Sequence, residues 1–239
     1  MRAPTAADLL SAWERALPQP RTLRPLTVLA ALTPGEDVGR LSVGARNVRL
    51  FRLRERFLGP QLHGLASCPA CAERLEFSFN AADVLANGEP PAELSGRCAG
   101  YDLRFRLPNG ADLVALAREM APGGPRVTLF RRCLLEVRAG ERPVAPEELT
   151  DEVIAWAAER MAEADPNADL RLALTCPACS HNWQLAFDVA AFFWEELHAW
   201  ARGLLREVHS LAQAYGWREA DILALSPARR RFYLELVSG

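Results

Sequence analysis

The feature that most constrains this chain is a short phrase that occurs twice. Residues 67–79 read SCPACAERLEFSF, and residues 175–187 read TCPACSHNWQLAF. Each copy has two cysteines separated by Pro-Ala, then a short polar turn, then alternating apolar residues that predict a half-buried strand. Because the flanks of the two cysteine pairs are so similar, we interpret the two copies as halves of one structure.

The four cysteines of the two copies have the spacing of a tetrahedral zinc site. The tight turn of a CxxC pair can direct both sulfur atoms toward one ion, and two pairs complete a four-thiolate shell without an open position, which is typical of structural zinc. Pro69 and Pro177 help to fix the turns. We call the CPAC turns at residues 68–71 and 176–179 knuckles. We therefore predict a zinc-ribbon-like module whose two knuckles are far apart in sequence and bind structural Zn²⁺ through Cys68, Cys71, Cys176 and Cys179.

Two other functions remain alternatives for the same cysteines. A thiol oxidoreductase is expected to carry its CxxC at the start of a helix, whereas both copies here lead into strands. A zinc-ribbon nucleic-acid-binding or regulatory protein would need a basic face, and the dispersed arginines and a net charge of −2 count against one. Cys98 and Cys133 lack partners at ligand spacing and are expected to be buried thiols. His181 is expected to be a turn residue.

Composition indicates a globular protein. The chain has 239 residues, of which 50% are hydrophobic and 24% charged. The charge balance gives no reason to expect a nucleic acid or a membrane surface as partner. No apolar run reaches the roughly 18 residues of a membrane span, and the N-terminus is too charged for a signal peptide. We expect a cytoplasmic protein, in which cysteines serve as ligands or core residues rather than disulfides.

Hydrophobic periodicity and turn residues predict the order of elements. Helices are expected within residues 5–17, 21–33, 42–58, 81–87, 111–119, 145–166, 189–214, 218–225 and 228–237. Strands are expected at 74–80, as a pair within 93–108, at 169–176 and at 182–188. Residues 121–125, APGGP, predict a flexible break. Residues 126–140 fit a helix or a strand, and the helix is favoured because Leu129, Cys133 and Val137 are four apart.

The predicted fold class is α+β, mostly helical, with small antiparallel β elements around the four-cysteine site. We expect three regions. Residues 1–66 form an N-terminal helical region, and residues 67–188 form the zinc-ribbon-like module with an inserted segment at about 90–165. Residues 189–239 form a long helix and a helical tail. Phosphate-binding loops, GxSxG elbows and HExxH motifs are absent from the sequence, so a non-enzymatic protein is expected.

The C-terminal region offers two candidate contact surfaces. Phe193, Trp194 and Trp200 are part of an apolar surface too broad for one helix stripe, which indicates a buried helix or one presented to a partner. Both interpretations stay open. The basic run Arg229–Arg231 could contact phosphate or an acidic protein. We favour a solvated helix face, with Phe232, Leu234 and Leu236 packed inward.

Four stretches together resemble a known family. They are SVGARNVRLFRLRERFLGPQLHGLASCPACAERLEFSFNAADVL, FRLPNGADLVAL, TCPACSHNWQLAFDVAAFFWEEL and LREVHSLAQAYGWREADILALSPARRRFYLELV. They are similar to the baseplate hub assembly chaperones of contractile-tailed phages and to relatives in phage-like contractile injection systems. The resemblance covers most of the chain from about Leu41, apart from the middle insertion.

The resemblance implies a non-enzymatic role in assembling the baseplate hub of a contractile particle. Its partners would be baseplate or hub proteins, and no catalytic residues carry over. Residues 215–236, YGWREADILALSPARRRFYLEL, are also similar to the C-termini of tail assembly proteins. This similarity adds Trp217, Arg230 and Tyr233 to the expected partner contacts. Which hub protein is bound, the oligomeric state and whether the chain stays in the finished particle remain open.

Overall fold

The computed structural model describes residues 4–116, 118 and 124–238. Contacts divide the chain into two units, residues 35–190 and a second unit formed by both ends of the chain, residues 1–34 and 191–239. The expected class is confirmed, because helices dominate and the strands form small antiparallel sheets. None of the helices among the described residues is long and apolar enough to cross a membrane.

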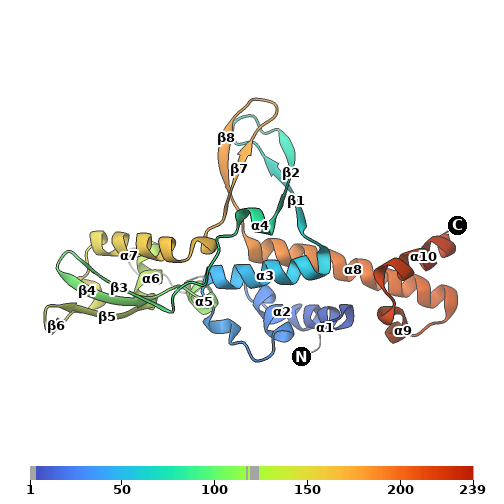
Figure 1. Ribbon diagram of the computed structural model, residues 1–239, viewed down its shortest axis with the longest axis horizontal. Coiled ribbons are helices and arrows are strands. Elements are labelled where there is room, and N and C mark those ends of the chain that lie inside the picture. Colours follow the sequence, from blue (N-terminus) through green and yellow to red (C-terminus); the bar gives the residue numbers. More distant parts are fainter. Residues whose placement is uncertain (1–3, 117, 119–123, 239) are drawn as a thin grey trace. The chain divides into compact units, whose positions relative to one another are not determined.

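The 35–190 unit holds all of the described strands (Figure 1). Two hairpins, β1–β2 and β7–β8, lie side by side, and β3–β4–β5–β6 form a separate antiparallel sheet. The elements are η1 (Val38–Arg40), α3 (Val43–Leu58), β1 (Gln61–Ser67), β2 (Arg74–Asn80), α4 (Ala81–Val84), β3 (Glu93–Cys98), β4 (Tyr101–Arg106), α5 (Gly110–Leu116), α6 (Gly124–Cys133), β5 (Leu134–Ala139), β6 (Arg142–Pro143), η2 (Pro146–Glu148), α7 (Asp151–Ala164), η3 (Pro166–Ala168), β7 (Arg171–Thr175) and β8 (Asn182–Ala186).

The four-stranded sheet and helices α6 and α7 share one apolar core. Phe105 of β4 is fully buried there, and the ring of Trp156 on α7 meets it edge to face. Trp156 also covers Gly96 of β3, where a Cβ atom would come within 2.6 Å of the indole. Strands β3 and β4 are joined by Ala99 and Gly100, both with positive φ, as tight hairpin turns require. The residues that lie between the two cysteine pairs in the sequence therefore form a close-packed core of their own.

The second unit is helical. It comprises α1 (Ala6–Ala16), α2 (Arg24–Leu32), most of α8 (Val189–Tyr215), α9 (Glu219–Ala224) and α10 (Pro227–Ser238). The expected cap at Thr5 is confirmed, since its hydroxyl accepts from the N–H of Asp8. Trp13 of α1 donates its indole N–H to His198 Nδ1 of α8 at 3.2 Å.

Three sequence expectations for these elements were wrong or incomplete. Residues 126–140 are not one helix, because α6 ends at Cys133 and β5 begins at Leu134. Strand β1 was not predicted at all. Phe232 and Leu236 do not pack inward but are 58% and 60% exposed, while Arg230 is buried. The expected break at 121–125 falls mainly on residues 121–123, which lie outside the described residues.

Candidate metal centre

Each CPAC phrase forms the turn of a β-hairpin. In the first, the N–H of Cys68 donates to the carbonyl of Glu73 at 2.8 Å, and the N–H of Ala72 donates to the carbonyl of Cys68 at 2.9 Å. In the second, the N–H of Cys176 donates to the carbonyl of His181 at 2.9 Å, and the N–H of Ser180 donates to the carbonyl of Cys176 at 2.9 Å. The shared CPAC sequence therefore produces the same backbone turn twice, although the two residues that follow it differ.

The residue after the second cysteine has a left-handed backbone in both turns. Ala72 has a φ of 63° and Ser180 a φ of 59°. Non-glycine residues seldom adopt this conformation, and it reverses the chain so that the following strand can return antiparallel to the first. The two strands after the knuckles, β2 and β8, also confirm that neither CxxC starts a helix, the position expected for a redox dithiol.

The two turns bring the four cysteines together. Cys68 Sγ lies 3.7 Å from Cys179 Sγ, and Cys71 Sγ lies 3.6 Å from Cys176 Sγ. All four sulfur atoms lie within 4.8 Å of one another. All four cysteines are free thiols, since these separations exceed the roughly 2.05 Å of a disulfide bond. The predicted pairing of distant halves is therefore present in the structure.

The set fits a metal ion in its geometry and in its donor chemistry. Tetrahedral zinc–thiolate bonds of about 2.3 Å would separate the sulfur atoms by about 3.8 Å, close to the distances between the two knuckles. Four soft sulfur donors without an oxygen ligand favour zinc or iron over magnesium or calcium. The four cysteines lie close enough to bind a metal ion.

Burial and backbone donors distinguish the four thiols. The first cysteine of each pair, Cys68 and Cys176, is buried, and the second, Cys71 and Cys179, is exposed. Burial raises the pKa of Cys68, but the N–H groups of Cys71 and Ala70, helped by the neighbouring thiols, outweigh it and lower the pKa to about 7. Amides directed at a sulfur atom in this way stabilise the thiolate, the form that binds metal.

Aromatic side chains pack beneath the knuckles. Phe79 of β2 meets Phe187 edge to face, with ring centroids 5.2 Å apart, and Phe187 stacks on Phe51 of α3. On β1, Gly64 leaves room for the ring of Phe77, which a Cβ atom would approach to 2.4 Å. These contacts join the two hairpins to each other and to α3, so the cysteine cluster is attached to a packed base.

The remaining cysteines and His181 lie outside the cluster. Cys133 is fully buried in the core beside the sheet, as expected, and Cys98 is partly buried against the same core. The ring of His181 stacks on Trp183. Among the described residues, the side chains close enough together to hold a metal ion are the four CPAC cysteines, and this histidine is not one of them.

Sequence reasoning missed a buried polar junction near the hairpin base. Asp165 Oδ2 accepts the N–H of Gly44 at 2.9 Å, at the start of α3. Asn47 donates to the carbonyl of Asn167 at 2.9 Å, and the Asn167 side chain bonds both backbone groups of Ala86. These groups connect α3 to the segments that follow β2 and precede β7. The sequence feature that could have indicated this junction is the polar pair Arg46-Asn47 inside an otherwise apolar helix start.

The expected partner contacts fall into two groups. Phe193, Trp194 and Arg230 are buried within the chain. Arg24 covers the Trp194 ring, with the guanidinium 5.0 Å from its centroid. Trp200, Trp217 and Tyr233 are partly exposed. The partner role of all six residues stays a prediction.

Comparison with known proteins gives one finding. The family model described as T4 bacteriophage base plate protein matches residues 25–194, well over half of the chain and including both knuckles. No curated protein and no solved structure matches the chain. The family match defines the class, a structural or assembly protein of a phage baseplate. The chain belongs to the T4 bacteriophage base plate protein family. The baseplate part of the resemblance is confirmed, and the hub-chaperone part stays a prediction.

Proposed function

We propose that this chain is a non-enzymatic assembly factor, or a structural component, for the baseplate hub of a contractile phage-tail-like particle. The observation that carries this proposal is the family match over residues 25–194. A hub role narrows that match to one part of the baseplate, and it is supported by the similarity of the four sequence stretches to hub assembly chaperones. The partners would be hub or other baseplate proteins.

We further propose that Cys68, Cys71, Cys176 and Cys179 hold one structural zinc ion. The support is the meeting of four thiols from two turns that are more than 100 residues apart in sequence. Four protein ligands leave no position for water or substrate, so the ion would clamp the two hairpins rather than catalyse a reaction. Binding free energy of structural zinc is on the order of 10 kcal/mol, enough to hold small hairpins that are marginal alone.

The hub role is tested by purifying the tagged chain from its native cell during particle assembly. We expect baseplate or hub proteins to co-purify. Recovery of nucleic-acid-processing complexes instead would favour the nucleic-acid-binding alternative and would contradict the proposal.

The zinc clamp is tested on the purified chain. We expect one zinc ion per chain by elemental analysis, and cobalt substitution should give the absorption bands of a tetrahedral thiolate site. Cys68→Ser and Cys179→Ser should each lose the ion and lower thermal stability strongly, whereas Cys98→Ser is the matched control. Retention of tight metal binding in both site variants would refute the clamp.

A further inference from the structure

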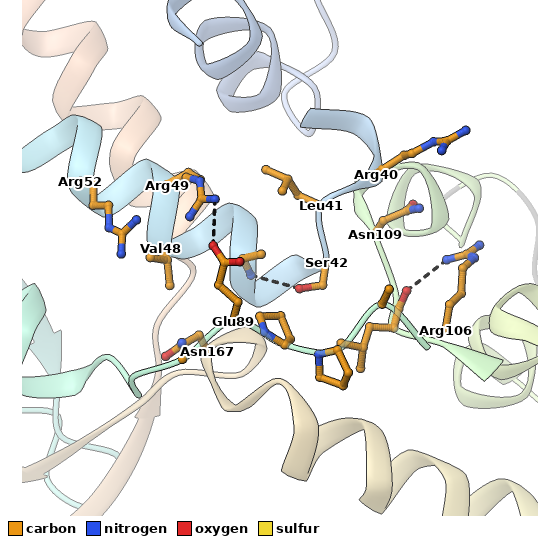
Figure 2. A pocket seen from close by; sticks show the side chains of 16 residues that line it. Arg40, Leu41, Ser42, Val48, Arg49, Arg52, Glu89, Arg106, Asn109 and Asn167 are labelled. Atoms are coloured by element: carbon orange, nitrogen blue, oxygen red, sulfur yellow. Dashed lines mark hydrogen bonds and ion pairs between the residues drawn. The ribbon is translucent and has the colours of Figure 1, made fainter. Parts of the chain in front are cut away.

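A groove in the 35–190 unit takes no part in the proposed zinc clamp. It has a volume of about 240 Å³ and lies between the start of α3, the loop at residues 88–92 and the connection from β4 to α5 (Figure 2). Four arginines line it, Arg40, Arg49, Arg52 and Arg106, with Glu89 as the lining carboxylate. The ion pairs of these arginines decide which of them is available to a ligand.

Arg106 is occupied by an ion pair within the chain. Its guanidinium binds both carboxylate oxygens of Asp112, at 2.5 and 2.9 Å, and Asp112 is only 1% exposed. A bidentate pair of this kind is a strong structural contact, so Arg106 forms part of the wall rather than a ligand-binding group.

Arg49 already holds a carboxylate from the loop. Its inner partner is Glu36 at 3.0 Å, and its outer partner is Glu89 at 3.4 Å. The Glu89 side chain is 83% exposed, which makes it an exchangeable partner, because exposed ion pairs add little stability. Figure 2 shows Glu89 reaching across the groove to Arg49. The groove therefore displays a carboxylate at the place where a ligand's carboxylate would bind.

Arg52 and Arg40 extend the cationic surface on either side of Arg49. Arg52 lies one turn further along α3, is exposed, and has no ion-pair partner among the residues that the structure describes. Arg40 pairs with Asp37 at 3.2 Å, but both side chains are largely exposed. A chain passing along the groove would meet three guanidinium groups that can accept carboxylates from outside.

The remaining lining fits a polypeptide better than a nucleic acid. Leu41, Val48, Pro90 and Pro91 give apolar walls, whereas Ser42 and Asn109 already use their side-chain oxygens to cap α3 and α5. Aromatic side chains, on which bases stack, are absent from the groove's lining residues. The chain's net charge of −2 also gives no general attraction for phosphate backbones.

We propose that this groove binds an acidic, extended segment of a partner protein, whose carboxylates replace Glu89 on Arg49 and pair with Arg52 and Arg40. The apolar side chains of that segment would lie against Val48 and the Pro90–Pro91 wall. The inference rests on the proposed function only in taking the occupant to be a protein.

The test uses the full purified chain and a fluorescein-labelled peptide of alternating Glu and Leu residues, with binding followed by fluorescence anisotropy at low salt. Arg52→Glu should weaken binding about tenfold or more, as expected for a lost charge-assisted pair. Arg202→Glu makes the same charge change at an exposed residue that does not line the groove, and because no direct pair with the peptide is lost it should leave affinity within about twofold. Glu89→Gln should strengthen binding severalfold, whereas Glu141→Gln, in an exposed turn, should not.

The proposal would be overturned if the peptide did not bind, or if Arg52→Glu and Arg202→Glu lowered the affinity for the peptide equally. It would also be overturned if a single-stranded oligonucleotide bound more tightly than the peptide and Arg52→Glu abolished that binding. Circular dichroism of each variant separates a lost contact from a lost fold. The peptide assay does not involve the baseplate particle. A negative result there would contradict the groove proposal alone, and the proposed function would still be tested separately by co-purification of baseplate proteins with the parent chain.

Discussion

Gly44 shows how a missing side chain fixes the start of α3. Its N–H donates to buried Asp165, and a Cβ atom at this position would lie 1.8 Å from Asp165 Oδ1. We expect Gly44→Ala to lower the free energy of unfolding by about 1–3 kcal/mol, because the carboxylate must move and loses its contact. Urea denaturation followed by circular dichroism measures this change.

Gly203 is the matched control for Gly44. It lies inside α8, its φ is not positive, and an added Cβ atom would meet nothing within 4 Å. Gly203→Ala should therefore stabilise the chain by about 0.5–1 kcal/mol, because alanine favours the helix. Equal losses at the two positions would argue against the steric explanation.

Asp112 gives the fold a dependence on pH. It accepts from Arg106, from the N–H of Asn109 at 3.0 Å and from Arg132 at 3.2 Å. Burial raises the pKa of this carboxyl, but these donors outweigh it, so its pKa lies below the ordinary value. The stabilisation is therefore complete above the ordinary carboxyl pKa of about 3.9 and is lost as the pH falls through the lowered pKa.

The corresponding variant is Asp112→Asn. At neutral pH it should lose about 1.5–3 kcal/mol, because the charge-assisted hydrogen bonds from Arg106 and Arg132 are lost while both arginines stay partly hydrated. The difference from the parent should begin to shrink as the pH falls below about 4, where the carboxyl of the unfolded parent becomes protonated, and should be lost once the pH is below the lowered pKa of the folded carboxyl. Denaturant titrations across this range check both statements, and a difference that grows toward acid would contradict the assignment.

At the scale of elements, α10 is held to α8 by a buried arginine. Arg230 bonds Glu207 of α8 at 3.0 Å and donates to the carbonyl of Leu225 at 2.7 Å. Arg230→Ala should lower the free energy of unfolding by about 1–3 kcal/mol, because the Leu225 carbonyl and Glu207 lose their donor. Arg231→Ala, exposed on the same helix, should change it by less than about 0.5 kcal/mol. Thermal unfolding of the two variants compares them directly.

The sequence predicted most elements and the cysteine set, because helix periodicity, caps and paired CxxC turns are local signals. Strand β1 was not predicted because Gly64 leaves a gap on its inward-facing side and Leu65 places an apolar side chain on its exposed side. The ring that fills the gap over Gly64 belongs to Phe77 of another strand. The change from α6 to β5 was hidden by Leu129, Cys133 and Val137, whose helical spacing is coincidental. The burial of Arg230 depends on Glu207, a partner 23 residues away.

The two hairpins should depend on the metal more than the four-stranded sheet does. Each hairpin has only two strands, with one face half-buried, and such hairpins are marginal alone. On chelation of the proposed zinc ion, amides of β1, β2, β7 and β8 should lose protection from hydrogen exchange. Amides of β4 and β5, next to the packed core, should keep theirs. Uniform loss across all strands would instead make zinc part of the global folding unit.

At the scale of the whole molecule, the 35–190 unit is continuous in sequence, whereas the other unit needs both ends of the chain. The family match at 25–194 covers the whole of this unit. A fragment of residues 35–190 should therefore fold with its own core and bind one zinc ion. Cooperative thermal unfolding and metal content of the purified fragment test this, and an unfolded fragment that recovers structure only with the chain ends present would contradict it.

The separation of the two knuckles in sequence also determines when, during synthesis, all four cysteines become available. Cys71 and Cys176 are 105 residues apart, so at about 5–20 residues per second the ribosome makes the second knuckle roughly 5–20 seconds after the first. During that interval the nascent chain carries two thiols with half a binding site, while the sheet and its helices emerge between them. The proposed ion could complete its shell only after Cys179 has been made, and its capture would mark a chain whose middle has already been made.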